Sequence, residues 1–245
     1  MSDSGATPGT RSALLEVIVL DAEDAVRAAA GGADRVELVG TMRESGLSPS
    51  PEVVAQVCRA VEIPVRPMVR LRGGFGTDAA EVSRLVGLAR AFMDAGADGL
   101  VLGFLDDTGA LDLEPVAALV GSGDVPWTFH RAIDHAADPD AAWSLLPGLP
   151  GLDQVLTAGS ADGVGAGLDA LLSRARSDAD AAALIMAGGG LRVEHVPDLL
   201  DAGVRAFHIG SPARQGGSFE QAVDPDRVAA WRERLLVQQP VVLET

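Results

Sequence analysis

Short apolar runs alternate with longer helical stretches along nearly the whole chain, from residue 14 to residue 237. Apolar runs bounded by Gly, Pro or acidic residues are typical of buried strands, whereas apolar positions spaced three and four apart indicate amphipathic helices. The pattern predicts strands at residues 14–19, 35–39, 65–70, 99–103, 127–130, 154–157, 184–187 and 206–209. It predicts helices at residues 21–30, 51–61, 79–95, 113–120, 139–146, 165–177, 193–202 and 226–237.

One junction recurs between these elements. Residues 32–36 (Gly-Ala-Asp-Arg-Val) and 96–100 (Gly-Ala-Asp-Gly-Leu) each end a helix with glycine and lead into a strand. Eight βα units in a chain of 245 residues are typical of a single (β/α)8 TIM-type barrel, which usually takes about 250 residues. An open doubly wound sheet is the alternative, but its Gly-x-Gly-x-x-Gly fingerprint is absent after the first strand.

The predicted barrel domain covers residues 13–238. A disordered N-terminal tail is expected at residues 1–12, and a C-terminal tail at residues 239–245. Residues 1–12 lack the apolar centre of a signal peptide, and no run approaches the ~20 apolar residues that cross a bilayer. We therefore expect a cytoplasmic protein with no membrane partner.

The composition excludes several kinds of partner and site. The net charge of −16 argues against nucleic acid as a partner, because phosphate binding needs clustered cations. Every one of the 19 basic residues is an arginine, so a lysine Schiff base is excluded. Cys58 is the single cysteine, which excludes an intramolecular disulfide and a metal site built only from thiols.

Ionisable residues fall in or at the ends of five predicted strands. In a barrel the active site lies at the carboxyl ends of the strands, and a charge inside an apolar strand is least costly when it points into the mouth. We expect one catalytic cluster, with the two glutamates at equivalent heights. Its predicted members are Glu16, Glu37, Arg70, His130 and His208. The alternative is structural: a buried Glu–Arg pair, and a strand-end histidine that only binds a loop.

Four further polar residues are predicted to have secondary roles. Arg131 and Asp134 follow His130 in the loop, where they could simply cap the next helix. Arg72 and Thr157 follow or end other predicted strands. His135 is expected to be a solvated residue at a helix start.

Glycine-rich loops follow the last two predicted strands. Gly188, Gly189 and Gly190 come after the seventh, and Gly210 and Ser211 come after the eighth. Loops at these positions of a barrel often bind phosphate through backbone N–H groups, and a side chain there would block the oxygens. The alternative is that three glycines only form a tight turn. The loops predict a small anionic partner, attracted by Arg192 or Arg214.

Several segments together resemble one known family. They are residues 14–17, 31–38 (Gly-Gly-Ala-Asp-Arg-Val-Glu-Leu), 48–50, 70–74 (Arg-Leu-Arg-Gly-Gly), 128–132 (Thr-Phe-His-Arg-Ala), 155–159, 185–190 and 207–208. In this order and at these spacings they resemble the CutC family of copper homeostasis proteins, which adopt a TIM-type barrel. The resemblance implies participation in copper homeostasis and a homo-oligomer, a dimer or larger. Copper itself is implied by the family name only.

The chain departs from the family at the expected copper ligands. Members commonly carry cysteine two residues after each strand glutamate, where this chain has Ile18 and Val39. Phe75 stands where the family has an aspartate after the Arg-Gly-Gly segment. Copper(I) prefers thiolate and thioether ligands. The sequence therefore assigns no cofactor and no confident metal site, and its weak metal candidates are His130, His208 and Met68.

Two functions remain open from the sequence. The family resemblance favours a role in copper homeostasis. The alternative is a lyase- or isomerase-type enzyme that performs acid–base chemistry on a small phosphorylated metabolite, with no direct copper role. In that enzyme Glu16 or Glu37 would be the base and His130 or His208 the acid, while Arg70 would neutralise developing charge.

Overall fold

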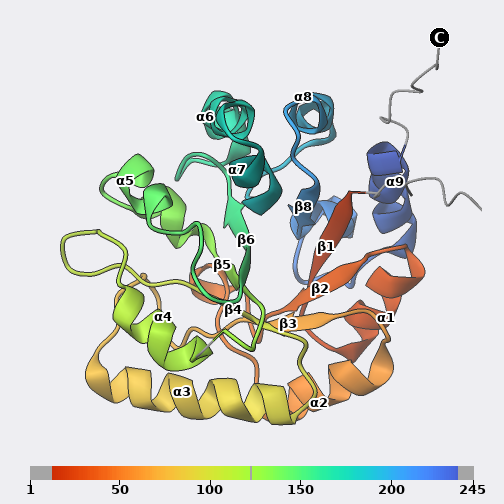
Figure 1. Ribbon diagram of the computed structural model, residues 1–245. Coiled ribbons are helices and arrows are strands. Elements are labelled where there is room, and N and C mark those ends of the chain that lie inside the picture. Colours follow the sequence, from red (N-terminus) through yellow and green to blue (C-terminus); the bar gives the residue numbers. More distant parts are fainter. Residues whose placement is uncertain (1–12, 122, 237–245) are drawn as a thin grey trace, which may run out of the picture.

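The structure is a computed structural model, and it describes residues 13–121 and 123–236. The predicted tails at residues 1–12 and 239–245 lie outside the described residues. Eight parallel strands form one sheet in the order β3-β2-β1-β8-β7-β6-β5-β4, and this sheet curls into a nearly closed barrel (Figure 1). The strands are β1 Leu14–Val19, β2 Arg35–Leu38, β3 Val65–Pro67, β4 Leu100–Leu102, β5 Trp127–Phe129, β6 Leu152–Thr157, β7 Ile185–Ala187 and β8 Ala206–Ile209. The predicted (β/α)8 fold is confirmed.

The barrel closes between β3 and β4 by a single bridge. Met68 pairs with Val101, and the Val69 N–H donates to the Val101 carbonyl at 2.8 Å. At the opposite end of β3, the Asp98 carboxylate accepts the Val65 N–H at 3.0 Å. The seam therefore depends on individual hydrogen bonds, whereas each of the other neighbouring strands is paired over at least two residues.

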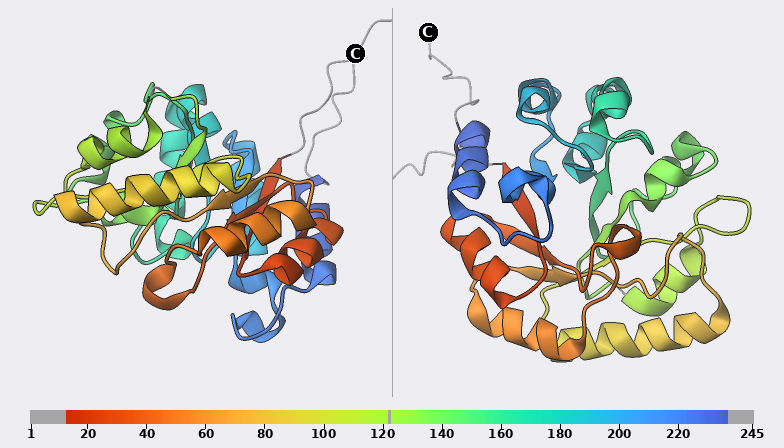
Figure 2. Two further views of the ribbon diagram at one scale, coloured as in Figure 1. Left: turned by 90° about the horizontal axis from the view of Figure 1, so that it is seen from below. Right: turned by 180° about the vertical axis from the view of Figure 1, so that it is seen from behind.

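Helices surround the strands (Figures 1 and 2). They are α1 Ala22–Ala30, α2 Pro51–Ala60, α3 Ala79–Asp94, α4 Leu113–Val120, α5 Pro139–Ser144, α6 Val164–Ser177, α7 Ala179–Leu184, α8 Val196–Asp201 and α9 Pro225–Leu236. Among the described residues, no helix is long and apolar enough to cross a membrane.

Aspartate and serine side chains begin most of these helices. Each accepts a backbone N–H of the first turn, which satisfies a donor that the helix leaves unpaired. The capping residues are Asp21, Ser50, Asp78, Asp112, Asp138 and Asp178. Part of the acidic excess of this chain is therefore structural.

The sequence pattern did not predict α7, and it predicted α8 as part of one longer helix. Residues 179–184 are mostly alanine and lack apolar periodicity, so only the Asp178 cap signalled a helix. The helix predicted at residues 193–202 begins as a separate 3₁₀ turn, Val193–His195, before α8 starts at Val196. Pro197 in the first turn of α8 fits this break, because proline lacks the N–H that would continue the bonding from the preceding turn.

The inside and outside of the barrel have different chemistry. Side chains that point outward, such as Leu15 and Val17, join the main core beneath the helices. The inward side chains form two apolar clusters, one containing Ile18 and Met68 and the other containing Leu156. A layer of buried charged residues also points inward, made by Glu16, Arg35, Glu37, Arg66 and His208. The barrel interior is thus partly ionic, and this places the candidate site.

Gly167 of α6 tests how closely helix and barrel pack. A Cβ at this position would lie 2.1 Å from the Ala158 carbonyl oxygen. Because the carbonyl belongs to the backbone and the backbone fixes the position of the Cβ, the backbone would have to move to relieve this contact. We expect Gly167→Ala to lower the free energy of unfolding by about 1–3 kcal/mol, measured by urea denaturation. Gly87→Ala in α3 is the matched control, because nothing lies within 4 Å of its added Cβ. The control should gain roughly 0.5–1 kcal/mol, and an equal gain in both variants would contradict the close packing.

Candidate active site

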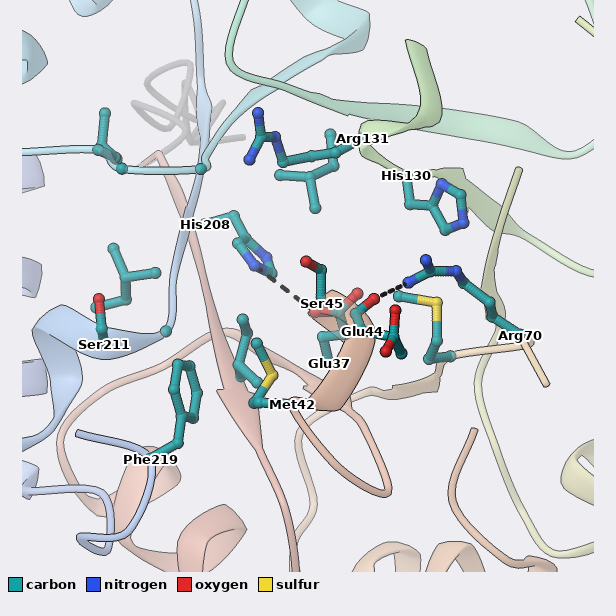
Figure 3. A pocket seen from close by; sticks show the side chains of 18 of the residues that line it. Glu37, Met42, Glu44, Ser45, Arg70, His130, Arg131, His208, Ser211 and Phe219 are labelled. Carbon is teal, nitrogen blue, oxygen red and sulfur yellow. Dashed lines mark hydrogen bonds and ion pairs between the residues drawn. The ribbon is translucent and has the colours of Figure 1, made fainter. Parts of the chain in front are cut away.

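A cavity of about 600 Å³ opens at the carboxyl ends of the strands, where barrel enzymes place their active sites (Figure 3). Its wall contains most of the predicted site residues. These are Glu37, Arg70, His130, Arg131, Gly189, Gly190, His208, Gly210 and Ser211. Glu16 and Gly188 do not line it, and Glu16 is fully buried within the barrel.

His208 lies between two carboxylates. Its Nδ1 is 2.7 Å from Glu16 Oε1, and its Nε2 is 3.6 Å from Glu37 Oε2. Arg35 Nε donates to the second oxygen of Glu16 at 2.5 Å. The strand register sets this arrangement, because Glu16 pairs with His208 on one side and with Arg35 on the other.

The two glutamates therefore lie at different heights. Glu37 pairs with Ile18, two residues further along β1 than Glu16, which corrects the expectation of equal heights. Strands of a closed barrel are staggered, so equivalent positions in two sequences do not occupy one level. Glu37 reaches the cavity and Glu16 stays beneath it.

These contacts fix the charges of Glu16 and His208. Burial by itself would raise the pKa of Glu16, but Arg35 and His208 outweigh it and lower that pKa to about 2. Burial would likewise lower the pKa of His208, yet its hydrogen bond to Glu16 and the charge of Glu37 raise it. At neutral pH, Glu16 is a carboxylate and His208 favours the imidazolium form.

Glu37 has the opposite shift from Glu16. Burial raises the pKa of Glu37 to about 7 against the attraction of His208, and the negative charge of Glu16 adds to the rise. Its side chain is 3% exposed, and Oε1 has no hydrogen-bond partner among the described residues. Glu37 can therefore both accept and release a proton near neutral pH, as a general acid–base group must.

His130 ends β5 and caps the short 3₁₀ turn Arg131–His135. Its Nδ1 accepts the Ala132 N–H at 3.2 Å, while its buried Nε2 has no partner within the described chain. Burial and the nearby Arg70 lower the pKa of His130 to about 3. His130 is a neutral imidazole at physiological pH.

Arg70 holds loops at the cavity mouth. Nη1 donates to the carbonyls of Glu44 and Gly46 at 2.6 and 3.0 Å, and Nε donates to Gly74 at 3.0 Å. The guanidinium also lies 5.0 Å from the centre of the Phe75 ring. Only Nη2 is left without a hydrogen bond to a described residue, so a role in neutralising substrate charge depends on that nitrogen.

Arg131 occupies the cavity wall, although the sequence suggested a secondary role. Its Nε donates to Asp134 at 2.8 Å, and Nη2 donates to the Ser160 and Ala161 carbonyls at 3.0 and 3.1 Å. Nη1 makes no hydrogen bond with the described part of the chain. Figure 3 shows the side chain projecting into the cavity near His208. The structure therefore adds Arg131 to the cations of the cavity.

Asp134 and Thr157, the other secondary predictions, fix the position of Arg131. Thr157 Oγ1 donates to Asp134 Oδ1 at 2.6 Å, and the Ala158 N–H donates to Oδ2 at 2.9 Å. Asp134 is thereby oriented from two directions before it binds Arg131. The three residues act as one unit that places a guanidinium at the cavity.

The glycine loops complete the same side of the cavity. The N–H groups of Gly189, Gly190, Gly210 and Ser211 make no hydrogen bond with any described residue, whereas the Gly188 N–H donates to Thr157 at 3.1 Å. Gly189 has a φ of +86°, and a Cβ there would lie 2.6 Å from Arg131 Nε. Gly189 is thus needed both for the turn and for the close approach of Arg131.

The remaining predicted residues lie elsewhere. Arg72 is half exposed and pairs with Glu81 at 2.8 Å, away from the cavity. Arg192 pairs with Glu194 at 2.6 Å, and Arg214 is buried against Asp24, also at 2.6 Å; neither lines the cavity. His135 is exposed, as expected, and it also lines the cavity, 4.9 Å from the centre of the Phe75 ring.

Sequence reasoning missed two arginines inside the barrel. Arg35 lies two residues before Glu37, so strand alternation could have placed it on the same face. Arg66 binds Asp153 at 2.6 Å and Thr128 at 2.9 Å.

Glu44 and Ser45 line the mouth of the cavity, and no sequence signal identified them. Their φ angles are 52° and 64°, and they are the only described non-glycine residues with positive φ.

The fold and the cavity define a (β/α)8 barrel protein with paired carboxyl and imidazole groups at the carboxyl ends of its strands. Within that class, this chain belongs to the CutC family, whose sequence pattern matches residues 13–212. The resemblance noted in the sequence is confirmed.

Relatives share most of their length with this chain. A family protein CutC from Klebsiella pneumoniae is 37% identical over 198 residues, covering 80% of this chain and 79% of the relative. One from Salmonella schwarzengrund is 35% identical over 233 residues, covering 90% and 92%. The crystal structure of a Streptococcus agalactiae CutC protein, named for copper homeostasis, has a TM-score of 0.70 and 26% identity over 81% of this chain and 98% of that one.

More distant structures share the fold alone. Phosphoribosylanthranilate isomerase from Thermotoga maritima has a TM-score of 0.62 at 14% identity, covering 92% of this chain and 99% of that one.

The cavity offers few copper ligands. Met42, Met68, His130 and His135 line it, but both ring nitrogens of His208 already face carboxylates. Ile18 and Val39 pack in an apolar cluster at the positions of the family's cysteines. Within residues 13–121 and 123–236, no three His, Cys, Asp or Glu side chains form a metal-binding group. Because copper(I) favours thiolates, this donor set does not fit a copper site.

The raised pKa of Glu37 predicts a pH-dependent stability. Its folded value of about 7 exceeds the ordinary 4.5, so its contribution is complete below about pH 4.5 and is lost as the pH rises through 7. Raising the pH from about 4 to about 8 should therefore cost the wild type roughly 3 kcal/mol relative to Glu37→Gln. Urea denaturation across this range measures it, with the exposed Glu233→Gln as the control. Parallel curves for wild type and Glu37→Gln would refute the assignment.

Proposed function

We propose that this protein is an acid–base enzyme of the lyase or isomerase type that acts on a small phosphorylated metabolite, with Glu37 transferring the proton. The observation that carries the proposal is the buried Glu37 carboxyl. The pKa of Glu37 is about 7, and its Oε1 has no hydrogen-bond partner among the described residues. Glu37 lies on the wall of the cavity, which also presents cations and free backbone N–H groups.

The residues around Glu37 support proton transfer. A base works best when its pKa lies near the working pH. His208 stabilises the ionised form of Glu37 from 3.6 Å, and it is itself held by Glu16, which Arg35 keeps ionised. The absence of lysine leaves acid–base steps that need no Schiff base.

A second set of cavity-wall residues supports an anionic substrate. Arg131 Nη1 and the N–H groups of Gly189, Gly190, Gly210 and Ser211 are hydrogen-bond donors without an acceptor among the described residues. Such donors suit phosphate oxygens. In a chain with a net charge of −16, the attraction must come from this local arrangement.

Glycerol 3-phosphate tests the anion-binding part of the proposal. We expect it to raise the melting temperature, following RT ln(1 + [L]/Kd), while glycerol has no effect. Arg131→Gln should weaken binding about 10–100-fold, the effect of one hydrogen bond to a charged group. Arg192→Gln is the matched control, because Arg192 lies two residues beyond Gly190 but outside the cavity. Equal affinity in both variants would contradict the role of Arg131.

Participation in copper homeostasis is the alternative that the relatives' names support. The donors of the cavity do not favour direct copper binding, so we expect purified protein to lose copper(I) to bathocuproine disulfonate. His130→Asn and Met68→Leu should leave copper content unchanged in metal analysis. Retention of one copper(I) per chain, lost in either variant, would favour copper as the cargo.

A further inference from the structure

Two buried polar atoms on the cavity wall have no hydrogen-bond partner among the described residues, namely Glu37 Oε1 and His130 Nε2. Their residues are 3% and 4% exposed. Most buried polar atoms in proteins are paired, so an unpaired one needs an explanation. The other three unpaired atoms belong to Arg66, Gln154 and Arg214, which do not line this cavity. These two atoms of cavity-wall residues are therefore buried side-chain groups whose hydrogen-bonding capacity the described residues leave unused.

The backbone determines which nitrogen of His130 carries its proton. Nδ1 accepts the Ala132 N–H at 3.2 Å, so it must present a lone pair. A neutral imidazole with an accepting Nδ1 carries its proton on Nε2. His130, a residue of the cavity wall, thus has a fixed N–H donor at the ring nitrogen that no described residue accepts.

The charges around His130 keep the ring neutral. Arg70 and His135 both disfavour a second proton on the ring, and burial acts in the same direction. Phe75 covers it at a centroid distance of 5.5 Å and carries no charge. His208 has the reverse environment, with a carboxylate near each ring nitrogen. The environment of His130 therefore favours the neutral imidazole, whereas that of His208 favours the cation.

We propose that His130 donates its Nε2–H to a carbonyl oxygen of the substrate while Glu37 removes a proton from the adjacent carbon, so that the substrate is a phosphorylated ketone or aldehyde that enolises. This inference rests on the proposed acid–base function and specifies its substrate class. A neutral imidazole suits this role because its N–H can stabilise the developing negative charge on oxygen while it keeps its proton.

The step balances without any further reactant. The Glu37 carboxylate takes the proton, and the C–H bonding pair becomes the new C=C bond. The π pair of the carbonyl moves to oxygen, which the His130 N–H stabilises. The Glu37 carboxylic acid then returns its proton to the enolate at the carbon that lost it, and the carbonyl forms again.

Nitrogen NMR tests the state of His130 directly in the whole protein. With ¹⁵N-labelled histidine, the His130 signals are those that disappear in His130→Asn, a variant in which asparagine can still accept the Ala132 N–H. We expect a protonated Nε2, an unprotonated Nδ1, and no titration between about pH 5 and pH 9. A ring protonated at Nδ1, or one that titrates in this range, would overturn the inference.

A pair of phosphate esters separates this inference from the proposed function. Phosphoglycolohydroxamate carries an enolate-like group, and glycerol 3-phosphate carries none. In calorimetry, His130→Asn should weaken hydroxamate binding about tenfold or more, while glycerol 3-phosphate binding stays within about twofold. Equal effects on both compounds, or on neither, would overturn the role of His130. If neither compound binds the wild type, the proposed function fails, and the tautomer measurement still decides the state of His130.

Discussion

The buried contacts among Arg35, Glu16 and His208 determine the electrostatics of this barrel. Removing charges from water costs several kcal/mol for each ion, and geometry must recover that cost. Here each oxygen of Glu16 accepts a short hydrogen bond, from Arg35 at 2.5 Å and from His208 at 2.7 Å. Glu16 is thereby held ionised, His208 is driven toward the cation, and Glu37 is the carboxyl whose charge remains adjustable. Glu16 makes the largest upward contribution to the pKa of His208, whereas the pKa of Glu37 is raised mainly by burial and further by the charge of Glu16.

A second ionic unit works at the cavity wall by similar means. Thr157 and the Ala158 amide orient Asp134, which in turn holds Arg131 against Gly189. Arg70 uses its donors on backbone carbonyls and fixes the loop that contains Glu44 and Ser45. The strained backbone of those two residues persists because the surrounding contacts hold it, and such strain is common at functional sites. Much of the polar chemistry near the mouth therefore positions other groups.

This chain belongs to the CutC family, but the described residues that line its cavity include none of the thiolates that copper(I) favours. The barrel, the strand glutamates and the histidines agree with the CutC pattern, while Ile18 and Val39 close the upper interior with apolar side chains. The thioethers of Met42 and Met68 and the imidazoles of His130 and His135 remain as copper donors. Acid–base groups, in contrast, are present with shifted pKa values on the cavity wall. These residues favour proton transfer over metal binding.

The fold could be predicted from the sequence, because strand and helix periodicities are local and eight βα repeats leave few topologies. Strand-end positions likewise indicated Glu37, Arg70, His130 and His208, all of which line the cavity. The charges of these residues and the contacts that set them became clear from the three-dimensional packing. Because the strands are staggered, Glu16 lies beneath Glu37, and the strand register places Arg35 beside Glu16. The packing of the loops places Arg131 on the cavity wall and directs Arg70 to backbone carbonyls. A pKa depends on burial and on charges a few ångströms away, and residues far apart in the sequence supply both.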